Sequence, residues 1–224
     1  MKSNTFMEML GEVCLPNVFN PYRDLCDAYD HAESPSIRCL NLRRYLETVE
    51  KEDLEAVWIG RDCGYRGGRR TGIALTDEPN LQNLEARLGN NQLLKATIGQ
   101  PVRERTATEV WKIMQEVEAK VFLWNVFPFH PFESGNSMSN RCHSAREFKE
   151  CREILYALLG WLKPRRIIAL GGDAQKAVSK MGFEVFPVRH PSYGGHIQFA
   201  STIRDLYGCA PKPDLAPELS LFSS

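Results

Sequence analysis

The sequence predicts an α/β fold in three layers, in which a four-stranded parallel sheet lies between helices on both faces. Four short apolar runs are expected to form the strands, at residues 56–59, 121–125, 167–170 and 184–188. Segments with helical spacing of apolar residues and with helix-capping residues separate these runs. Strands that alternate with helices form parallel sheets, and near-continuous apolar strands fit burial on both faces.

The first part of the chain is expected to hold two helices before the first strand. Residues 1–19 are expected to be irregular. A capping side chain followed by proline at the first helical position starts a helix, and this pattern occurs at Asn20-Pro21 and at Ser34-Pro35. The expected helices cover residues 21–31 and 35–50.

Capping patterns also predict the helices in the middle of the chain. A short helix is expected over residues 80–88. Capping boxes follow at residues 106–109 and 144–147, where a hydroxyl and a glutamate carboxylate satisfy opposite backbone amides. The first box opens a helix that runs to about residue 120. The second opens a long helix that must stop before Pro164, because the residue before a proline disfavours helical conformation.

The last third of the chain contains two further helices and a tail. After the third strand, Asp173 is expected to cap a helix that ends at Gly182. A final helix over residues 198–207 is expected to stop at Gly208. Residues 209–224 are rich in proline and are expected to be a flexible tail, so the sequence predicts one domain over residues 1–208.

Composition narrows the class of protein. The chain of 224 residues has no net charge, so a nucleic-acid partner would need locally clustered positive charge. Seven cysteines without a CxxC pair argue against zinc ribbons and iron–sulfur clusters, and favour reduced thiols in a cytoplasmic protein. The start of the chain lacks the apolar core of a secretory signal, and no apolar run approaches the ~20 residues that span a bilayer.

A loop rich in glycine and arginine, the Gly-Arg loop, follows the first strand and covers residues 60–75. Glycine lets the backbone approach a ligand closely, and loops at the carboxyl ends of parallel strands bind ligands in open α/β sheets. The loop is therefore either a ligand-binding element or a solvated basic turn. Its charged residues are one acid, Asp62, and four arginines, Arg61, Arg66, Arg69 and Arg70.

An acid, an amide and an imidazole stand at the ends of three expected strands. They are Asp62, Asn125 and His190. Because the carboxyl ends of parallel strands lie at one edge of the sheet, these side chains can converge on one small ligand. An amide can read the edge of a pyrimidine, and an imidazole can hydrogen-bond to developing negative charge. A carboxylate can position water or stabilise a cation.

Each of these side chains also has a purely structural interpretation. Asp62 can cap a turn, and Asn125 can satisfy backbone groups at a strand end. His190 stands before a proline and can belong to a surface loop. The same choice between packing and ligand binding applies to four neighbours of the second strand: Phe127, Phe129, His130 and Phe132.

Three segments taken together resemble the motifs of the uracil-DNA glycosylase superfamily. They are Gly-Arg-Asp-Cys-Gly-Tyr at 60–65, Phe-Leu-Trp-Asn at 122–125 and His-Pro-Ser at 190–192. The best-known branch has Gly-Gln-Asp-Pro-Tyr-His, a strand that ends in Asn, and His-Pro-Ser-Pro. The motifs occur in the same order here, each at the end of an expected strand, and the resemblance covers about residues 55–207. Residues 163–171 also look like the segment before that family's fourth helix.

The resemblance implies a monomeric DNA-repair enzyme without metal or cofactor. It would flip a nucleotide out of DNA and hydrolyse the bond between deoxyribose and uracil, or a related deaminated or 5-substituted base. Asp62 would position or activate water, Asn125 would bind the base, and His190 would stabilise the leaving anion. Further substrate contacts are expected at Gly60, Gly64, Tyr65, Leu75 and Phe129, and DNA contacts at Arg66, Arg69, Arg70, Ser192 and Tyr193.

Three positions depart from the pattern of the best-known branch. Gly64 stands where a bulky tyrosine excludes the thymine methyl group, so room is expected beside C5 of the base. Leu75 stands where an aromatic ring stacks on uracil. Gly194 replaces a wedge leucine and leaves Tyr193 or His196 to fill the gap. These departures look more like the single-strand-selective or mismatch-specific branches.

Two other functions fit the same sequence less well. A doubly wound nucleotide-binding protein would need a phosphate fingerprint of the GxGxxG type, and Gly171-Gly172-Asp173 is not one. A non-catalytic nucleic-acid-binding module on the same fold would not require both Asp62 and His190.

The end of the tail carries an apolar cluster, Glu218-Leu219-Ser220-Leu221-Phe222. It resembles the pentapeptide that binds the bacterial sliding clamp, with Glu218 in place of the usual glutamine. Either these side chains fold back onto the domain, or the tail is a docking peptide on a flexible linker.

Overall fold

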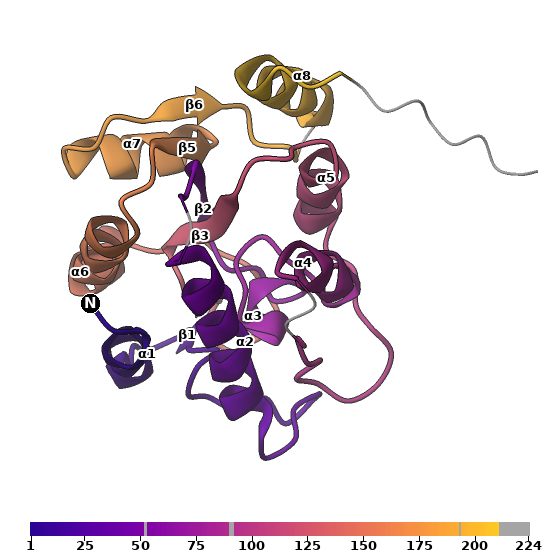
Figure 1. Cartoon of the computed structure of the whole chain (residues 1–224). Helices are drawn as coiled ribbons and strands as arrows, with labels where there is room; N and C mark the ends of the chain where they lie inside the picture. Colours follow the sequence, from indigo (N-terminus) through magenta and orange to yellow (C-terminus); the bar gives the residue numbers. More distant parts are fainter. Residues whose placement is uncertain (52, 90–91, 193, 211–224) are drawn as a thin grey trace, which may run out of the picture.

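Four parallel strands form the central sheet, in the order β3-β2-β5-β6 (Figure 1). The computed structural model describes residues 1–51, 53–89, 92–192 and 194–210. Within them the strands are β2 (Ala56–Asp62), β3 (Val121–Phe127), β5 (Arg166–Leu170) and β6 (Phe186–Val188). The expected α/β class and four-stranded parallel sheet are confirmed, and a small antiparallel pair, β1 (Val18–Phe19) with β4 (His130–Pro131), was not expected.

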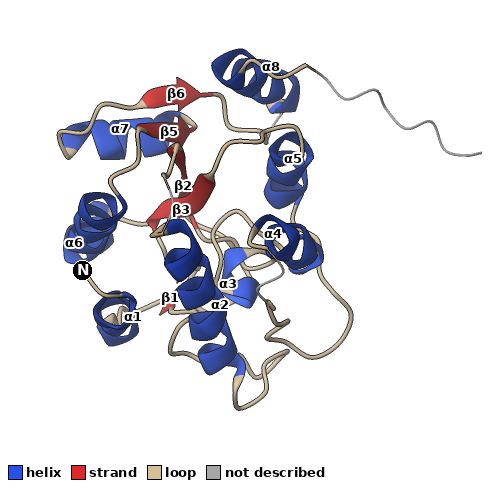
Figure 2. Cartoon of the chain, in the orientation of Figure 1, coloured by secondary structure: helices blue, strands red, loops and turns tan. Residues whose placement is uncertain are grey.

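Helices cover both faces of this sheet, as Figure 2 shows, with α6 and α7 on one side and α5 and α8 on the other. The helices before β3 are α1 (Ser3–Glu12), α2 (Ser34–Val49), α3 (Gly68–Thr71), the 3-10 turn η1 (Glu78–Asn80), α4 (Leu81–Arg87) and α5 (Arg105–Met114). Those after it are α6 (Ala145–Leu162), α7 (Gly172–Lys180) and α8 (His196–Tyr207). None of the helices in the described ranges is long and apolar enough to cross a membrane.

A buried tryptophan packs against a covering helix on each face of the sheet. Trp58 of β2 packs edge-on against Phe199 of α8 at 6.2 Å, and its indole N–H donates to the Tyr207 hydroxyl. On the other face, Trp124 of β3 lies 5.7 Å from Phe6 of α1. All of these rings except Tyr207 are fully buried. Trp124 pairs with Ile59, the neighbour of Trp58, so the two tryptophans point to opposite faces of the sheet.

The free edge of β3 is closed by a side chain of α2. The Tyr45 hydroxyl donates to the carbonyl oxygen of Val121 at 2.8 Å and accepts from the amide of Leu123 at 3.1 Å. An uncovered strand edge is a template for association with another chain. Tyr45 therefore satisfies backbone groups that β3 cannot pair within its own sheet.

Two expectations for the first part of the chain are wrong. Residues 1–19 are not irregular throughout, because α1 forms and buries Phe6, Met7 and Leu10. Residues 21–31 form turns rather than a helix. The Asn20 side chain accepts from the Tyr22 amide at 2.9 Å and donates to the Leu10 carbonyl, so it closes a turn instead of capping a helix.

Helix boundaries confirm one capping box and correct two other assignments. Ser144 and Glu147 form the expected box at the start of α6. Thr106 and Glu109 do not, because α5 begins at Arg105 and its cap residue makes no side-chain capping bond. Asp173 lies in the first turn of α7, after a Gly171 cap whose φ of 93° favours glycine. Strands β2 and β3 also continue past the expected residues 56–59 and 121–125, to Asp62 and Phe127, and α5 ends at Met114 rather than near residue 120.

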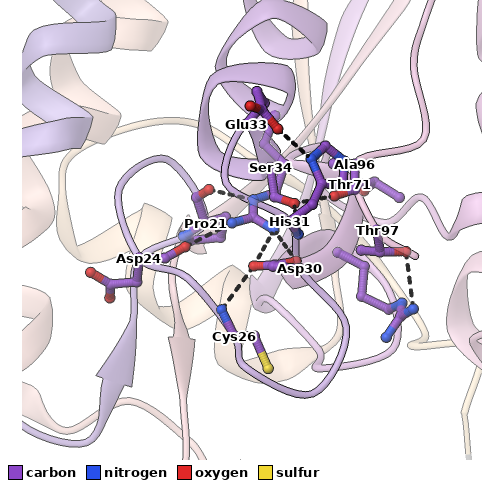
Figure 3. A network of polar contacts seen from close by, with 12 residues as sticks. Pro21, Asp24, Cys26, Asp30, His31, Glu33, Ser34, Thr71, Ala96 and Thr97 are labelled. Atoms are coloured by element: carbon purple, nitrogen blue, oxygen red, sulfur yellow. Dashed lines mark hydrogen bonds and ion pairs between the residues drawn. The ribbon is translucent and has the colours of Figure 1, made fainter. Parts of the chain in front are cut away.

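A buried ion pair organises the turns between β1 and α2. Arg38 is fully buried and donates to both Asp30 carboxylate oxygens, at 2.9 and 3.0 Å. It also donates to the carbonyls of Pro21 and Asp24. Figure 3 shows Asp30 at the centre of this network, where it also accepts from the Cys26 amide. The expected helix is replaced by a loop whose shape is fixed by one arginine.

The expected tail lies almost entirely outside the described residues. The segment Glu218–Phe222 falls in the undescribed range 211–224, so both its flexibility and its docking to a clamp stay predictions. The division into one domain over residues 1–208 and a tail over 209–224 stays a prediction as well.

Neutralising Asp30 should destabilise the fold strongly. In Asp30→Asn the Arg38 charge stays buried without its partner, and we expect a loss of about 3 kcal/mol in the free energy of unfolding. Asp53→Asn makes the same chemical change in an ion pair with Arg165 whose side chains are 68% and 64% exposed. This control should lose at most about 1 kcal/mol. Urea unfolding measures both, and equal losses would contradict the organising role of Asp30.

Candidate active site

A cavity of about 570 Å³ opens at the carboxyl ends of β2, β3 and β5 and beside the loop after β6. Asp62 at the end of β2, Asn125 two residues before the end of β3, and His190 two residues after β6 all line it. Gly64 and Leu75, which the sequence predicts as substrate contacts, and Ser192, which it predicts as a DNA contact, also line it. The parallel register places Gly60 beside Asn125 and Asp62 beside Phe127, so the strands themselves bring these groups together.

Gly60 permits the close approach of Asn125 and Leu75 at the floor of the cavity. A Cβ atom at residue 60 would lie 2.6 Å from Asn125 Oδ1 and 2.9 Å from Leu75 Cδ2. Any larger side chain at Gly60 would therefore displace the amide. Gly60 contributes to the site by leaving space.

The Asn125 amide is oriented by Cys63 and offers a free acceptor. Its Nδ2 donates to Cys63 Sγ at 3.4 Å. Burial raises the pKa of the Cys63 thiol to about 12, so the sulfur is neutral. Asn125 Oδ1 is buried and has no hydrogen-bond partner among the described residues. Because a buried, unpaired acceptor is costly, this oxygen is suited to a ligand that donates a hydrogen bond.

Asp62 is held by two basic side chains. Arg61 Nε donates to Asp62 Oδ2 at 2.6 Å, and Arg61 also pairs with Asp173. His143 Nδ1 and the His143 amide both contact Asp62 Oδ1. The His143 ring stacks on Phe127, with centroids 5.3 Å apart. Asp62 and His143 thus form a fixed carboxylate–imidazole pair at the end of β2.

His143 is a candidate that sequence reasoning missed. It stands one residue before Ser144, the capping residue of α6, so the start of that helix positions it. The available signal was a histidine next to a capping box, which by itself indicates no contact with Asp62. Within the described residues, no three His, Cys, Asp or Glu side chains gather into a set that could hold a metal ion.

His190 is arranged as a neutral hydrogen-bond donor. Its Nδ1 accepts from the Ser192 amide at 3.2 Å and lies 2.7 Å from the Ser192 hydroxyl. With Nδ1 as the acceptor, the proton of the neutral ring lies on Nε2. Burial, and then the nearby Arg61 and Arg189 charges, lower the pKa of His190 from its ordinary value.

Glu104 occupies the space that Gly64 leaves and is a second residue that the sequence did not reveal. Its Cδ atom lies 3.2 Å from the position of a Cβ at Gly64 and 2.7 Å from that of a Cβ at Gly67. The expectation of free room beside Gly64 is therefore wrong. Burial, with a smaller contribution from Asp77, raises the pKa of the Glu104 carboxyl to about 7.

Two of the arginines expected to contact DNA are structural instead. Arg69 and Arg70 are only 2% and 7% exposed. Arg69 lies 4.0 Å from the centre of the Phe19 ring and donates to His130, and Arg70 pairs with Glu78 at 3.0 Å. Their charges are satisfied inside the fold, so the assignment of both residues to DNA phosphates is corrected.

The remaining predicted contacts divide between cavity, surface and core. Phe129 is fully buried, does not line the cavity, and packs against Phe127, which corrects its assignment as a stacking residue. Tyr65 also lies outside the cavity wall, where the exposed Arg66 donates to its hydroxyl. Tyr193 falls outside the described residues.

Glu104 should make stability fall as pH rises. The folded state keeps a proton on this carboxyl up to about pH 7, whereas the unfolded state loses it near the ordinary value of 4.5. Between these values the folded state binds more protons, so raising the pH destabilises it. The free energy of unfolding of Glu104→Gln relative to wild type should therefore increase as the pH rises. The increase between about pH 4.5 and about pH 8 should be about 1 to 3 kcal/mol.

The control for this comparison is Glu109→Gln, on helix α5, which begins directly after Glu104, but outside the cavity. Urea unfolding across the pH range measures all three proteins. A difference between Glu104→Gln and wild type that does not change with pH would contradict the buried state of Glu104.

Comparison with known proteins gives the same picture of the fold. The crystal structure of wild-type SMUG2 from Pedobacter heparinus matches with a TM-score of 0.60 and 14% sequence identity, over 92% of this chain and 98% of that one. No curated protein matches the chain. The family model of the uracil DNA glycosylase superfamily matches residues 48–204, a range that contains β2, the Gly-Arg loop, Asn125 and His190. The chain therefore belongs to the uracil DNA glycosylase superfamily.

Proposed function

We propose that the protein is a DNA-repair glycosylase that hydrolyses the N-glycosidic bond of uracil, or of a related deaminated or 5-substituted base, in DNA. One observation carries this proposal: Asp62, Asn125 and His190 line the same cavity, and Asn125 Oδ1 is left without a partner. A base inside a duplex cannot reach such a cavity. The nucleotide must be flipped out of the stack, at a cost of a few kcal/mol.

The orientation of Asn125 favours uracil over cytosine. Cys63 holds the amide nitrogen, so Oδ1 is the amide atom that is left to accept from an incoming base. The N3 position of uracil carries a hydrogen that can be donated to this oxygen. Cytosine has an acceptor at N3 and would leave two buried acceptors facing each other, which is strongly unfavourable.

His190 and the Asp62–His143 pair support the two halves of the reaction. As the C1′–N1 bond breaks, its electrons move onto the base, and the N–H of neutral His190 can stabilise the charge at O2. The negative charge of Asp62 stabilises the cationic sugar. Water then adds to C1′, and its proton passes to the Asp62–His143 pair.

One observation favours a non-catalytic base-binding module as the second candidate. Both Asp62 oxygens are already engaged, by Arg61 and by His143. A carboxylate with these partners is well suited to a purely structural role. Measured base release separates the two candidates, since a binding module would retain a flipped uracil without cleaving it.

Substitution of the proposed catalytic residues should abolish most base release. Asp62→Asn and His190→Ala should each lower the single-turnover rate by roughly 10²–10⁴-fold, because each removes a charge or a donor from the transition state. Oligonucleotides that carry uracil are incubated with each variant, and abasic sites are then cleaved by alkali and quantified.

Asp205→Asn and His31→Ala are matched controls, because both residues lie outside the cavity wall. They should retain the wild-type rate. Near-normal rates in Asp62→Asn and His190→Ala would remove the assignment, and a wild type that binds uracil DNA but releases nothing would leave the binding module.

Arg66 is proposed as the phosphate contact of the Gly-Arg loop, since it is exposed whereas Arg69 and Arg70 are buried. Losing one phosphate contact reduces the slope of log affinity against log salt concentration by about 0.9 on duplex DNA. We expect this reduction in Arg66→Ala. Arg165→Ala, just before the start of β5 at the opposite end of the sheet, should keep the wild-type slope. Equal slopes for all three proteins would assign Arg66 to solvent.

Other aspects of the proposed function come from the sequence alone. A monomer is inferred from the resemblance of the motifs to the superfamily, and a cytoplasmic location from the cysteines without a CxxC pair. A tail that docks on a sliding clamp through residues 218–222 would bring the glycosylase to newly replicated DNA.

A further inference from the structure

Two glycines of the Gly-Arg loop form a cradle for one carboxyl group. A Cβ atom at Gly64 would overlap Oε1 of Glu104, and a Cβ atom at Gly67 would overlap Oε2. Neither position therefore accepts a side chain while Glu104 keeps its place. The loop approaches the start of α5 closely because these two residues have no side chain.

The backbone amide of Glu104 is held by a buried carboxylate, that of Asp77. Its amide donates to Oδ2 of Asp77 at 2.8 Å, and the other Asp77 oxygen accepts from the Asn80 side chain at 2.6 Å. Asp77 is fully buried. Residue 104 is therefore fixed by a buried carboxylate, and its side chain lines the cavity.

The carboxyl group of Glu104 lacks a partner within the described part of the chain. No ion pair or hydrogen bond to its oxygens occurs there, although Arg105 is the next residue. A carboxyl group that is cradled by glycine backbone and left without a donor is suited to contact a ligand.

The position of Glu104 around the cavity relates it to one edge of a bound pyrimidine. Asn125 contacts Cys63, Cys63 precedes Gly64, and Gly64 touches Glu104. Cys63 and Gly64 therefore lie on the Nδ2 side of the amide, and in a pyrimidine that donates from N3 to Oδ1 with C4 on that side, C5 is the next ring atom towards Gly64. If Asn125 Oδ1 accepts from N3, as the proposed function requires, the wall formed by Gly64 and Glu104 faces the side of the ring that bears C5.

We propose that Glu104 is the specificity-determining residue at the C5 side of the base. It fills the volume that Gly64 leaves, and it selects bases that bring a hydrogen-bonding group to this wall over bases that bring a methyl group. This inference rests on the proposed function, because it places the flipped base in this cavity. Gly64 has no side chain with which to discriminate between groups at C5 of the base. The inference assigns this discrimination to Glu104, which lies in another part of the chain.

The chemistry of the carboxyl group gives the direction of selection. The methyl group of thymine would take water away from the Glu104 oxygens and offer no hydrogen bond in return. A hydroxymethyl group at C5 can accept from the protonated carboxyl group or donate to the ionised one. Uracil leaves the wall open and needs neither contact.

The test compares thymine, uracil and 5-hydroxymethyluracil in otherwise identical oligonucleotides. Binding is measured by fluorescence anisotropy with 2′-fluoroarabino nucleotides, which resist hydrolysis, and base release is measured with the deoxynucleotides. Glu104→Ala removes the carboxyl group and its volume, Glu104→Leu removes only its polarity, and Glu104→Gln keeps hydrogen bonding. Glu109→Ala, on α5 but outside the cavity, is the control.

Wild type should prefer 5-hydroxymethyluracil to thymine. In Glu104→Ala and Glu104→Leu, the binding and release of thymine relative to the other two bases should rise roughly 10-fold to 100-fold. This is the range of discrimination that one group in a pocket provides. Glu104→Gln and Glu109→Ala should keep the wild-type order. Because Glu104→Leu and Glu104→Gln preserve volume, the test remains decisive if Glu104→Ala does not fold.

The two assays separate this inference from the proposed function. Binding preferences that depend on Glu104, without any base release, would overturn hydrolysis and support the assignment of Glu104. Base release with unchanged preferences in Glu104→Ala and Glu104→Leu would overturn the assignment and leave hydrolysis in place. A wild type that fails to discriminate thymine from 5-hydroxymethyluracil in both assays would also overturn it.

Discussion

The pairing of β2 with both β3 and β5 is the constraint on which the rest of the structure depends. This strand is central, its first four residues are fully buried, and its register with β3 sets Gly60 beside Asn125. Only a residue without a side chain at position 60 allows the amide and Leu75 to meet there. A slip of one residue would turn Asn125 to the other face of the sheet, so the cavity depends on backbone hydrogen bonds.

Positive charge in the Gly-Arg loop serves mainly to fix the loop. Arg69 and Arg70 point into the fold, where they lie over the rings of Phe19 and Tyr29 and meet His130 and Glu78. A buried guanidinium requires such partners, because its desolvation is otherwise uncompensated. The result is a rigid loop between β2 and η1. Rigidity of this kind keeps the cradle of Gly64 and Gly67 in place around Glu104.

Two of the carboxyl groups that line the cavity, those of Asp62 and Glu104, lie in contrasting environments. Asp62 is surrounded by cationic or protonatable partners, Arg61 and His143, whereas Glu104 has none among the described residues and a pKa near 7. Environments that separate two carboxyl groups in this way commonly give them different roles. Asp62 is suited to act at the sugar, and Glu104 is suited to contact the base.

The sequence by itself determined the α/β class, the four strands, the capping box at Ser144 and the polar residues at or near three strand ends, because each depends on short-range pattern. It did not determine α1, the turns around Asp30, the burial of Arg69 and Arg70, or the contacts of His143 and Glu104. Each of these depends on a partner far away in the chain, such as Asp62 for His143 and Gly64 for Glu104. From sequence alone, an arginine is expected at the surface. Only the packed structure shows whether a buried carboxylate or aromatic ring is available to pair with it. Local pattern therefore located the site at one edge of the sheet, whereas tertiary packing decided which charged groups face the ligand.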